Sequence, residues 1–98
     1  MPKTNRIEIE NVLQPGKTYR VDAEKFAAMR AAVLAELPGA QPGLTPAELK
    51  TRVLGRLPDA LFPGGDKAGW WLKAVQLDLE AKRTIGRAPT APVRLHRL

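Results

Sequence analysis

The side chains best suited to chemistry in this sequence are basic and amide groups within residues 66–83. On a helix that turns by about 100° per residue, Lys73, Gln76, Glu80 and Arg83 fall on one polar arc. Lysine and arginine pair with guanine in the DNA major groove, and glutamine pairs with adenine. The arc therefore predicts base contacts from Lys73, Gln76 and Arg83. Glu80 argues against this function, because its negative charge repels phosphate.

The segment after this arc is basic. Lys82, Arg83, Arg87, Arg94 and Arg97 follow the last acidic residue, Glu80, and the net charge of the chain is +6. Such a cluster is typical of a surface that binds a polyanion, with Arg87, Arg94 and Arg97 expected to contact phosphate or the minor groove. The same pattern is also expected of a solvated tail that keeps the protein soluble.

The sequence shows no set of residues that predicts catalysis. It contains no cysteine, which excludes a thiolate metal site, and His96 is its single histidine. Asp78 and Lys82 have the spacing of a structural ion pair on a helix. No phosphate-binding glycine loop or nucleophile elbow is present. We therefore expect no enzyme activity, no cofactor, no metal ion and no small-molecule substrate.

The composition is that of a globular protein. Of the 98 residues, 44% are apolar and 27% are charged, which argues against general disorder. This length suits one domain, predicted over residues 7–98 after a disordered tail at residues 1–6. No apolar run is long enough for a membrane span, and no secretory signal is evident, so we expect a cytoplasmic protein without a membrane partner.

Capping signals predict three helices. Asp22 is suited to cap the first helix, which ends near Pro38. The sequence from Thr45 to Glu48 forms a capping box for the second helix, which Pro58 ends. The third helix is expected over residues 66–83, with Asp66 at its start. Extended segments are expected at residues 6–12 and 18–21, as an arm or a hairpin, and at 84–87 and 93–97, as a hairpin with its loop at 88–92.

This order of elements predicts a mainly α fold with a small β component. Three helices followed by a hairpin are typical of a winged helix-turn-helix, here with an extended N-terminal arm and a C-terminal β-hairpin as the wing. In that fold the third helix and the wing would bind double-stranded DNA. The proline- and glycine-rich turn at residues 63–65 is longer and looser than the usual turn before a recognition helix.

The third predicted helix has more apolar surface than packing against two partner helices requires. Trp71, Val75 and Leu79 form one apolar strip, while Trp70 and Leu77 belong to a second. The second strip must be covered by the N-terminal arm, by the tail or by another molecule. The alternative function is therefore a protein-interaction or homodimerisation module with Trp70 and Leu77 in the interface. Dimerisation and DNA binding are compatible with each other.

Several segments resemble a bacterial family of small winged-helix-like proteins of unknown function. The similar segments are 15–22 (PGKTYRVD), 61–65 (LFPGG), 67–71 (KAGWW) and 75–82 (VQLDLEAK). The resemblance extends over roughly residues 7–97 and implies a compact domain in a bacterium, with no known activity to transfer. Thr84 departs from the pattern, since a glycine or an apolar residue is expected where the chain turns into the wing.

Overall fold

A computed structural model describes residues 6–89 and 91–98. Residues 1–5 of the predicted tail, and Thr90 in the predicted hairpin loop, lie outside the described residues. Arg6, also assigned to the tail, is instead the first residue of a strand. In the described residues the elements are β1 (Arg6–Glu10), β2 (Thr18–Asp22), α1 (Ala23–Glu36), α2 (Pro46–Leu54), a 3₁₀ turn (Pro63–Gly65), α3 (Ala68–Ala81), β3 (Ile85–Arg87) and β4 (Leu95–Arg97).

The two N-terminal extended segments form an antiparallel hairpin, which was one of the two predicted arrangements. Its register pairs Arg6 with Asp22 at one end and Glu10 with Thr18 at the other. Gly16 lies in the turn with φ of +87°, a conformation that costs glycine little. The hairpin therefore returns the chain directly to the start of α1.

The capping predictions for α1 and α2 are confirmed. The Asp22 carboxylate accepts hydrogen bonds from the backbone N–H groups of Glu24 and Lys25, at 2.9 and 3.1 Å. Thr45 and Glu48 form the reciprocal bonds of a capping box. However, α2 ends at Leu54, before the predicted stop at Pro58, because Gly55 follows and disfavours further helix.

Both ends of α3 differ from the prediction. The helix begins at Ala68 after Lys67, which has a left-handed backbone with φ of 56°, and no side chain caps it. Asp66 is therefore not the cap. At the other end Arg83 takes φ of 59°, and the Thr84 N–H donates to the Leu79 carbonyl at 2.9 Å. Arg83 thus occupies the left-handed position that glycine usually fills after a helix.

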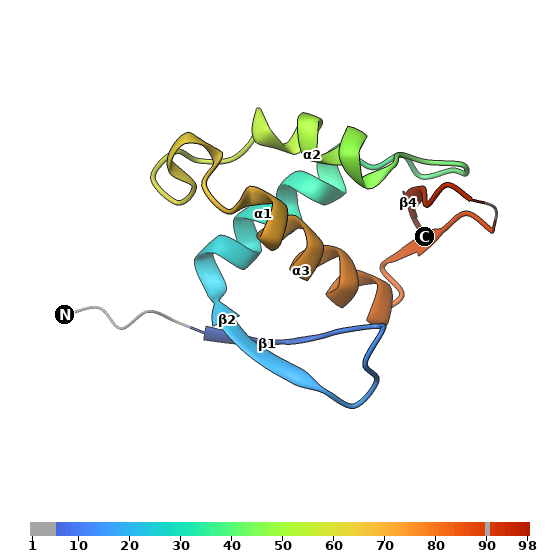
Figure 1. The fold of residues 1–98 in the computed structure, drawn as a ribbon, viewed down its shortest axis with the longest axis horizontal. Coiled ribbons are helices and arrows are strands. Elements are labelled where there is room, and N and C mark those ends of the chain that lie inside the picture. Colours follow the sequence, from blue (N-terminus) through green and yellow to red (C-terminus); the bar gives the residue numbers. More distant parts are fainter. Residues whose placement is uncertain (1–5, 90) are drawn as a thin grey trace.

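The third helix is the centre of the fold. It contacts α1, α2 and a strand of each hairpin, and Figure 1 shows it crossing the middle of the molecule between them. Nine of its 14 residues are buried. The core around it combines side chains of the three α-helices, including Phe26, Val53, Val75 and Leu79, with Phe62 from the segment between α2 and the 3₁₀ turn. This helix is therefore the main core element of the described residues.

The predicted C-terminal hairpin is also present. Strands β3 and β4 pair antiparallel, with Gly86 opposite His96. Leu95 and Leu44 exchange two backbone hydrogen bonds, of 2.9 and 2.7 Å, which attach the hairpin to the α1–α2 loop. Gly43 permits this contact, because a Cβ at this position would lie 1.9 Å from the Leu95 carbonyl oxygen. The chain is thus a mixed α/β fold with three helices and two antiparallel hairpins over the described residues.

Candidate functional site

The polar arc predicted for α3 is not a single exposed surface. Lys73 and Arg83 are exposed, but only 7% of Gln76 and 9% of Glu80 is accessible. The expectation that Gln76 faces a DNA groove is therefore wrong for this conformation. The physical reason is that the segment after β1 and the C-terminal hairpin fold over this side of the helix, a long-range arrangement that helical periodicity does not contain.

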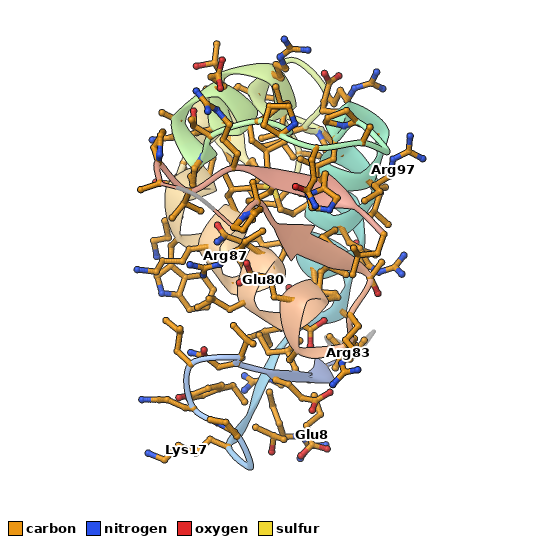
Figure 2. The ribbon with its side chains drawn as sticks, turned by 90° about the vertical axis from the view of Figure 1, so that its right-hand side faces the viewer. Glu8, Lys17, Glu80, Arg83, Arg87 and Arg97 are labelled. Atoms are coloured by element: carbon orange, nitrogen blue, oxygen red, sulfur yellow. The ribbon has the colours of Figure 1, made fainter. Side chains whose placement is uncertain are left out.

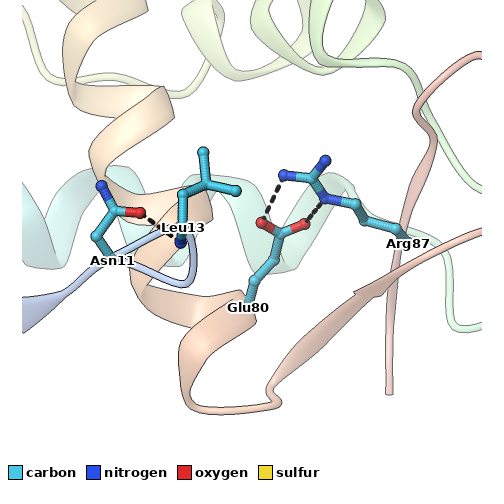
Figure 3. A network of polar contacts seen from close by, with 4 residues as sticks. All are labelled: Asn11, Leu13, Glu80 and Arg87. Atoms are coloured by element: carbon cyan, nitrogen blue, oxygen red, sulfur yellow. Dashed lines mark hydrogen bonds and ion pairs between the residues drawn. The ribbon is translucent and has the colours of Figure 1, made fainter. Parts of the chain in front are cut away.

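Glu80 and Arg87 form an ion pair that joins α3 to β3. The Arg87 guanidinium donates to both carboxylate oxygens, with the Nη2–Oε2 distance at 3.0 Å (Figure 3). The side chain of Glu80 is 5% exposed and that of Arg87 is 39% exposed. Hydrogen bonding to Glu80 raises the pKa of Arg87. The pair neutralises Glu80, whose negative charge argues against DNA contact. It also engages Arg87, which is one of the arginines predicted to contact phosphate.

The other predicted DNA-binding residues do not converge on one surface. Arg97 donates from Nε to the Leu37 carbonyl at 2.8 Å, which ties it to the end of α1. Arg94 is half-buried, and its charge lowers the pKa of Glu48 on α2, after the larger effect of hydrogen bonds from Thr45. In Figure 2, Arg97 lies at the upper right and Arg83 lower down on the same side, whereas Arg87 lies near the centre beside Glu80. Of the predicted DNA-binding residues that lie outside the C-terminal hairpin, Lys73 and Arg83 are exposed and Gln76 is buried.

The predicted ion pair between Asp78 and Lys82 is confirmed, with a nitrogen–oxygen distance of 2.9 Å. The same carboxylate also accepts a 2.8 Å hydrogen bond from the backbone N–H of Glu10. Asp78 is fully buried. It therefore fastens the N-terminal hairpin to α3, a role that no local sequence signal indicates because the partners are 68 residues apart.

The two tryptophans have different environments, as predicted from their angular positions. Trp71 is 7% exposed and packs edge-on against Phe62, with ring centroids 6.4 Å apart. Trp70 is 59% exposed. Its ring meets that of Trp71 edge-on, with centroids 5.0 Å apart and an interplanar angle of 79°. Trp71 therefore belongs to the core, whereas Trp70 is an aromatic side chain held on the surface.

Beside Trp70 lies a hollow of about 420 Å³ between α3 and the N-terminal hairpin, which we call the Trp70 groove. Its polar lining comes from Glu10, Asn11, Arg20 and Lys73. Its apolar lining comprises Ile9, Tyr19, Val21, Trp70, Ala74 and Leu77. The groove is therefore mostly apolar and has two cations and one acid in its walls.

Leu77, the second predicted interface residue, is largely covered by its own chain. It is 7% exposed, and its carbonyl accepts a 3.3 Å hydrogen bond from the Val12 N–H. The segment after β1 thus covers part of the second apolar strip of α3 and leaves Trp70 open. Leu77 therefore lines the Trp70 groove and does not form a protruding surface.

A second hollow, of about 490 Å³, lies on the other side of Lys73 and is called here the Lys50 hollow. It shares Lys73 and Leu77 with the Trp70 groove. A Cβ added to Gly69 would lie 3.4 Å from the Lys50 ammonium, an ordinary van der Waals distance, so the Lys50 side chain of α2 reaches the first turn of α3. The rest of the lining includes Leu13, Pro46, Ala47, Leu72, Gln76, Arg87 and Val93.

Several of the most exposed apolar side chains surround these hollows. Leu13 is 64% exposed and borders the Lys50 hollow, while Tyr19 is 42% exposed and borders the Trp70 groove. The Asn11 side chain accepts a 2.8 Å hydrogen bond from the Leu13 backbone, close to the Glu80–Arg87 pair (Figure 3). Exposed apolar groups gathered around a concave surface are typical of an interaction site.

The described residues show little that suggests other chemistry. Within residues 6–89 and 91–98, no group of three or more metal-ligating side chains comes together. None of the helices in those ranges has the length and apolar character needed to cross a membrane.

Comparison with known proteins identifies the family. A family of unknown function, DUF6958, matches residues 6–95, and the chain belongs to this family. The resemblance to a family of unknown function is thereby confirmed. The search found no matching curated protein and no matching solved structure.

Proposed function

We propose that this protein is a non-catalytic protein-interaction module that binds its partner through the face of α3 that carries Trp70. The observation that supports this most directly is the contrast between Trp70, 59% exposed, and Trp71, 7% exposed. Tryptophan is the residue type most enriched among those that dominate binding energy at protein interfaces. An exposed tryptophan beside an apolar groove is therefore the strongest candidate for an anchor.

The setting of Trp70 favours binding. Its ring already packs edge-on against Trp71, so ordering it in a complex costs less conformational entropy than ordering an isolated side chain. Ala74 and Leu77 provide an apolar lining beside it. A partner side chain placed in the Trp70 groove would lose water from both surfaces, which is the main favourable contribution to most protein association.

We further propose that the fold is of the winged-helix type. The order α1, α2, α3 and then a β-hairpin supports it, with β3 and β4 as the wing. In that comparison α3 takes the place of the recognition helix. The part of α3 that would enter DNA carries Trp70, Lys73 and Ala74, and this mixed apolar surface is better suited to a protein than to base edges.

DNA binding is a second candidate function. The specific observation in its favour is that Arg87 neutralises Glu80, so the acid on α3 no longer presents a free charge to phosphate. Lys73 and Arg83 remain exposed, and the net charge is +6. Binding by this surface would weaken strongly with salt. Duplex DNA titrated at low and high salt, and followed by fluorescence anisotropy, tests it; no binding at low salt by folded protein would exclude it.

The protein-interaction function is tested by selecting a displayed random peptide library on the folded protein. We expect enriched peptides that bind the wild type and lose roughly 30-fold in affinity with Trp70→Ala, which corresponds to a typical interface anchor. Leu54→Ala is the matched control, because Leu54 is 42% exposed and lines neither hollow. Failure to enrich any peptide, or peptides that bind Trp70→Ala as tightly as the wild type, would contradict the proposal.

A further inference from the structure

We infer that the partner segment is an acidic amphipathic peptide, with apolar side chains on either side of a carboxylate. This inference rests on the proposed protein-interaction function and specifies the chemistry of the partner. The Trp70 groove and the Lys50 hollow share Lys73 and Leu77, so they adjoin one another on α3. A segment that crosses both would place an apolar group in each and would pass Lys73 between them.

The charges along this path favour a negatively charged segment. Arg20 and Lys73 line the Trp70 groove, and Lys50 and Lys73 line the Lys50 hollow. Among the described residues, these three cations form no ion pair with a carboxylate. Glu10 is the one acid in the lining of either hollow. Arg87, the remaining cation, is already neutralised by Glu80.

The same charges argue against a second copy of the chain as the occupant. A two-fold dimer brings the same surface patch of both copies together. On this face each copy would bring two cations, Arg20 and Lys73, against a single acid, Glu10. The two patches would therefore both carry a net positive charge, and like charges at an interface are unfavourable. A partner that carries carboxylates would instead be attracted by the net charge of +6.

Single-stranded nucleic acid is the other polyanion with an affinity for aromatic and cationic surfaces. Tyr19 and Trp70 both line the Trp70 groove, which suits base stacking. However, the rest of the apolar lining of that groove is aliphatic, and the Lys50 hollow is lined by no aromatic side chain. Apolar side chains of a peptide fill such surfaces better than bases do, and this favours the peptide.

The inference is tested by the composition of the peptides selected from the random library. We expect enriched sequences to combine aspartate or glutamate with large apolar residues. If the enriched peptides depend on Trp70 but are neutral or basic, the acidic-partner inference is wrong and the proposed function stands. If no peptide is enriched, both are wrong.

A charge-reversed variant provides the second measurement. The double substitution Arg20→Glu with Lys73→Glu is expected to weaken binding of the enriched peptides about tenfold, with a smaller effect at high salt. Lys17→Glu is the control, because Lys17 lies in the turn of the N-terminal hairpin and lines neither hollow (Figure 2). Equal effects of the double variant and the control would overturn the inference.

The nucleic-acid alternative is measured in the same experiment. A single-stranded thymidine homopolymer is titrated against wild-type protein and against Trp70→Ala. We expect that any binding of the homopolymer does not depend on Trp70 and that the homopolymer does not displace the enriched peptides from the wild type. A homopolymer that displaces the peptides from wild-type protein, and whose own binding is lost with Trp70→Ala, would overturn the peptide inference in favour of nucleic acid.

Discussion

The contact between the α1–α2 loop and the C-terminal hairpin gives the most quantitative prediction, because the chain offers a matched pair of glycines. Gly43 has φ of +88° and Gly16 has φ of +87°. A Cβ at Gly43 would lie 1.9 Å from the Leu95 carbonyl oxygen, whereas a Cβ at Gly16 meets no atom within 4 Å. Alanine at either position is strained by a nearly equal positive φ, but only Gly43→Ala creates a clash.

The size of the effect follows from these contacts. The left-handed backbone costs about 1–2 kcal/mol at either position. At Gly43 the clashing atoms are backbone atoms that cannot rotate away, so the bridge between Leu44 and Leu95 must open. Loss of its two hydrogen bonds costs about 1 kcal/mol each. We therefore expect Gly43→Ala to reduce the free energy of unfolding by about 3–4 kcal/mol and Gly16→Ala by about 1–2 kcal/mol.

Urea denaturation followed by tryptophan fluorescence measures both changes. The reduced unfolded-state entropy that alanine brings is common to the two variants and cancels in their difference. Hydrogen exchange at the Leu44 and Leu95 amides shows whether the bridge has opened in Gly43→Ala. Equal destabilisation by the two substitutions, with both amides still protected in Gly43→Ala, would refute this account of the loop.

Other predictions concern packing, a buried carboxylate, a helix end and acid stability. Trp71→Ala is expected to cost about 3–5 kcal/mol of unfolding free energy and Trp70→Ala less than about 1 kcal/mol, measured by urea denaturation followed by circular dichroism; similar costs would contradict their assignment to core and surface. Asp78→Ala is expected to cost about 2–3 kcal/mol and to accelerate amide exchange in β1, because the Glu10 N–H loses a charged acceptor; unchanged exchange there would contradict this role. Arg83→Gly is expected to stabilise the protein by up to about 1 kcal/mol, because glycine accepts the left-handed backbone after α3 at lower cost; a loss of stability would contradict the strain. Hydrogen bonds from Thr45 lower the pKa of the Glu48 carboxyl, so its contribution to stability is present above the ordinary glutamate pKa and lost as the pH falls through the lowered value. Glu48→Gln is therefore expected to flatten the acid side of the stability profile, and an unchanged profile would show that this carboxylate is not involved.

The sequence predicted the elements of this fold well where the signals were local. Asp22 and the capping box at Thr45 placed the starts of α1 and α2 correctly, because capping depends on residues close together in the chain. The end of α3 was harder to place. The left-handed position belongs to Arg83, and without a glycine there the sequence has no strong stop signal.

The candidate site was predicted only in part. Helical geometry separated Trp70 from Trp71 correctly, because the angle between neighbouring residues is fixed by the helix itself. The burial of Gln76 and Glu80 was missed, since it depends on which distant segments fold over α3. The number of charges along the sequence likewise does not show that Arg87 is paired, although the buried Glu80 carboxylate of the same chain binds it.

The groove itself could not be predicted from the sequence. Its walls come from the N-terminal hairpin and from α3, which are far apart in the chain and are joined through the Asp78 carboxylate. This contact joins the last residue of β1 to α3 across 68 positions of the chain. The sequence predicted that the second apolar strip needs a cover, but not how much of it the chain itself provides.

The face around Trp70 is proposed as a docking surface for another protein. The most direct test compares the affinity of one enriched peptide for wild-type protein and for Trp70→Ala, with the unfolding free energy of both measured in the same buffer. We predict roughly 30-fold weaker binding with a change in stability below about 1 kcal/mol. Unchanged affinity in a stably folded Trp70→Ala variant would contradict the claim.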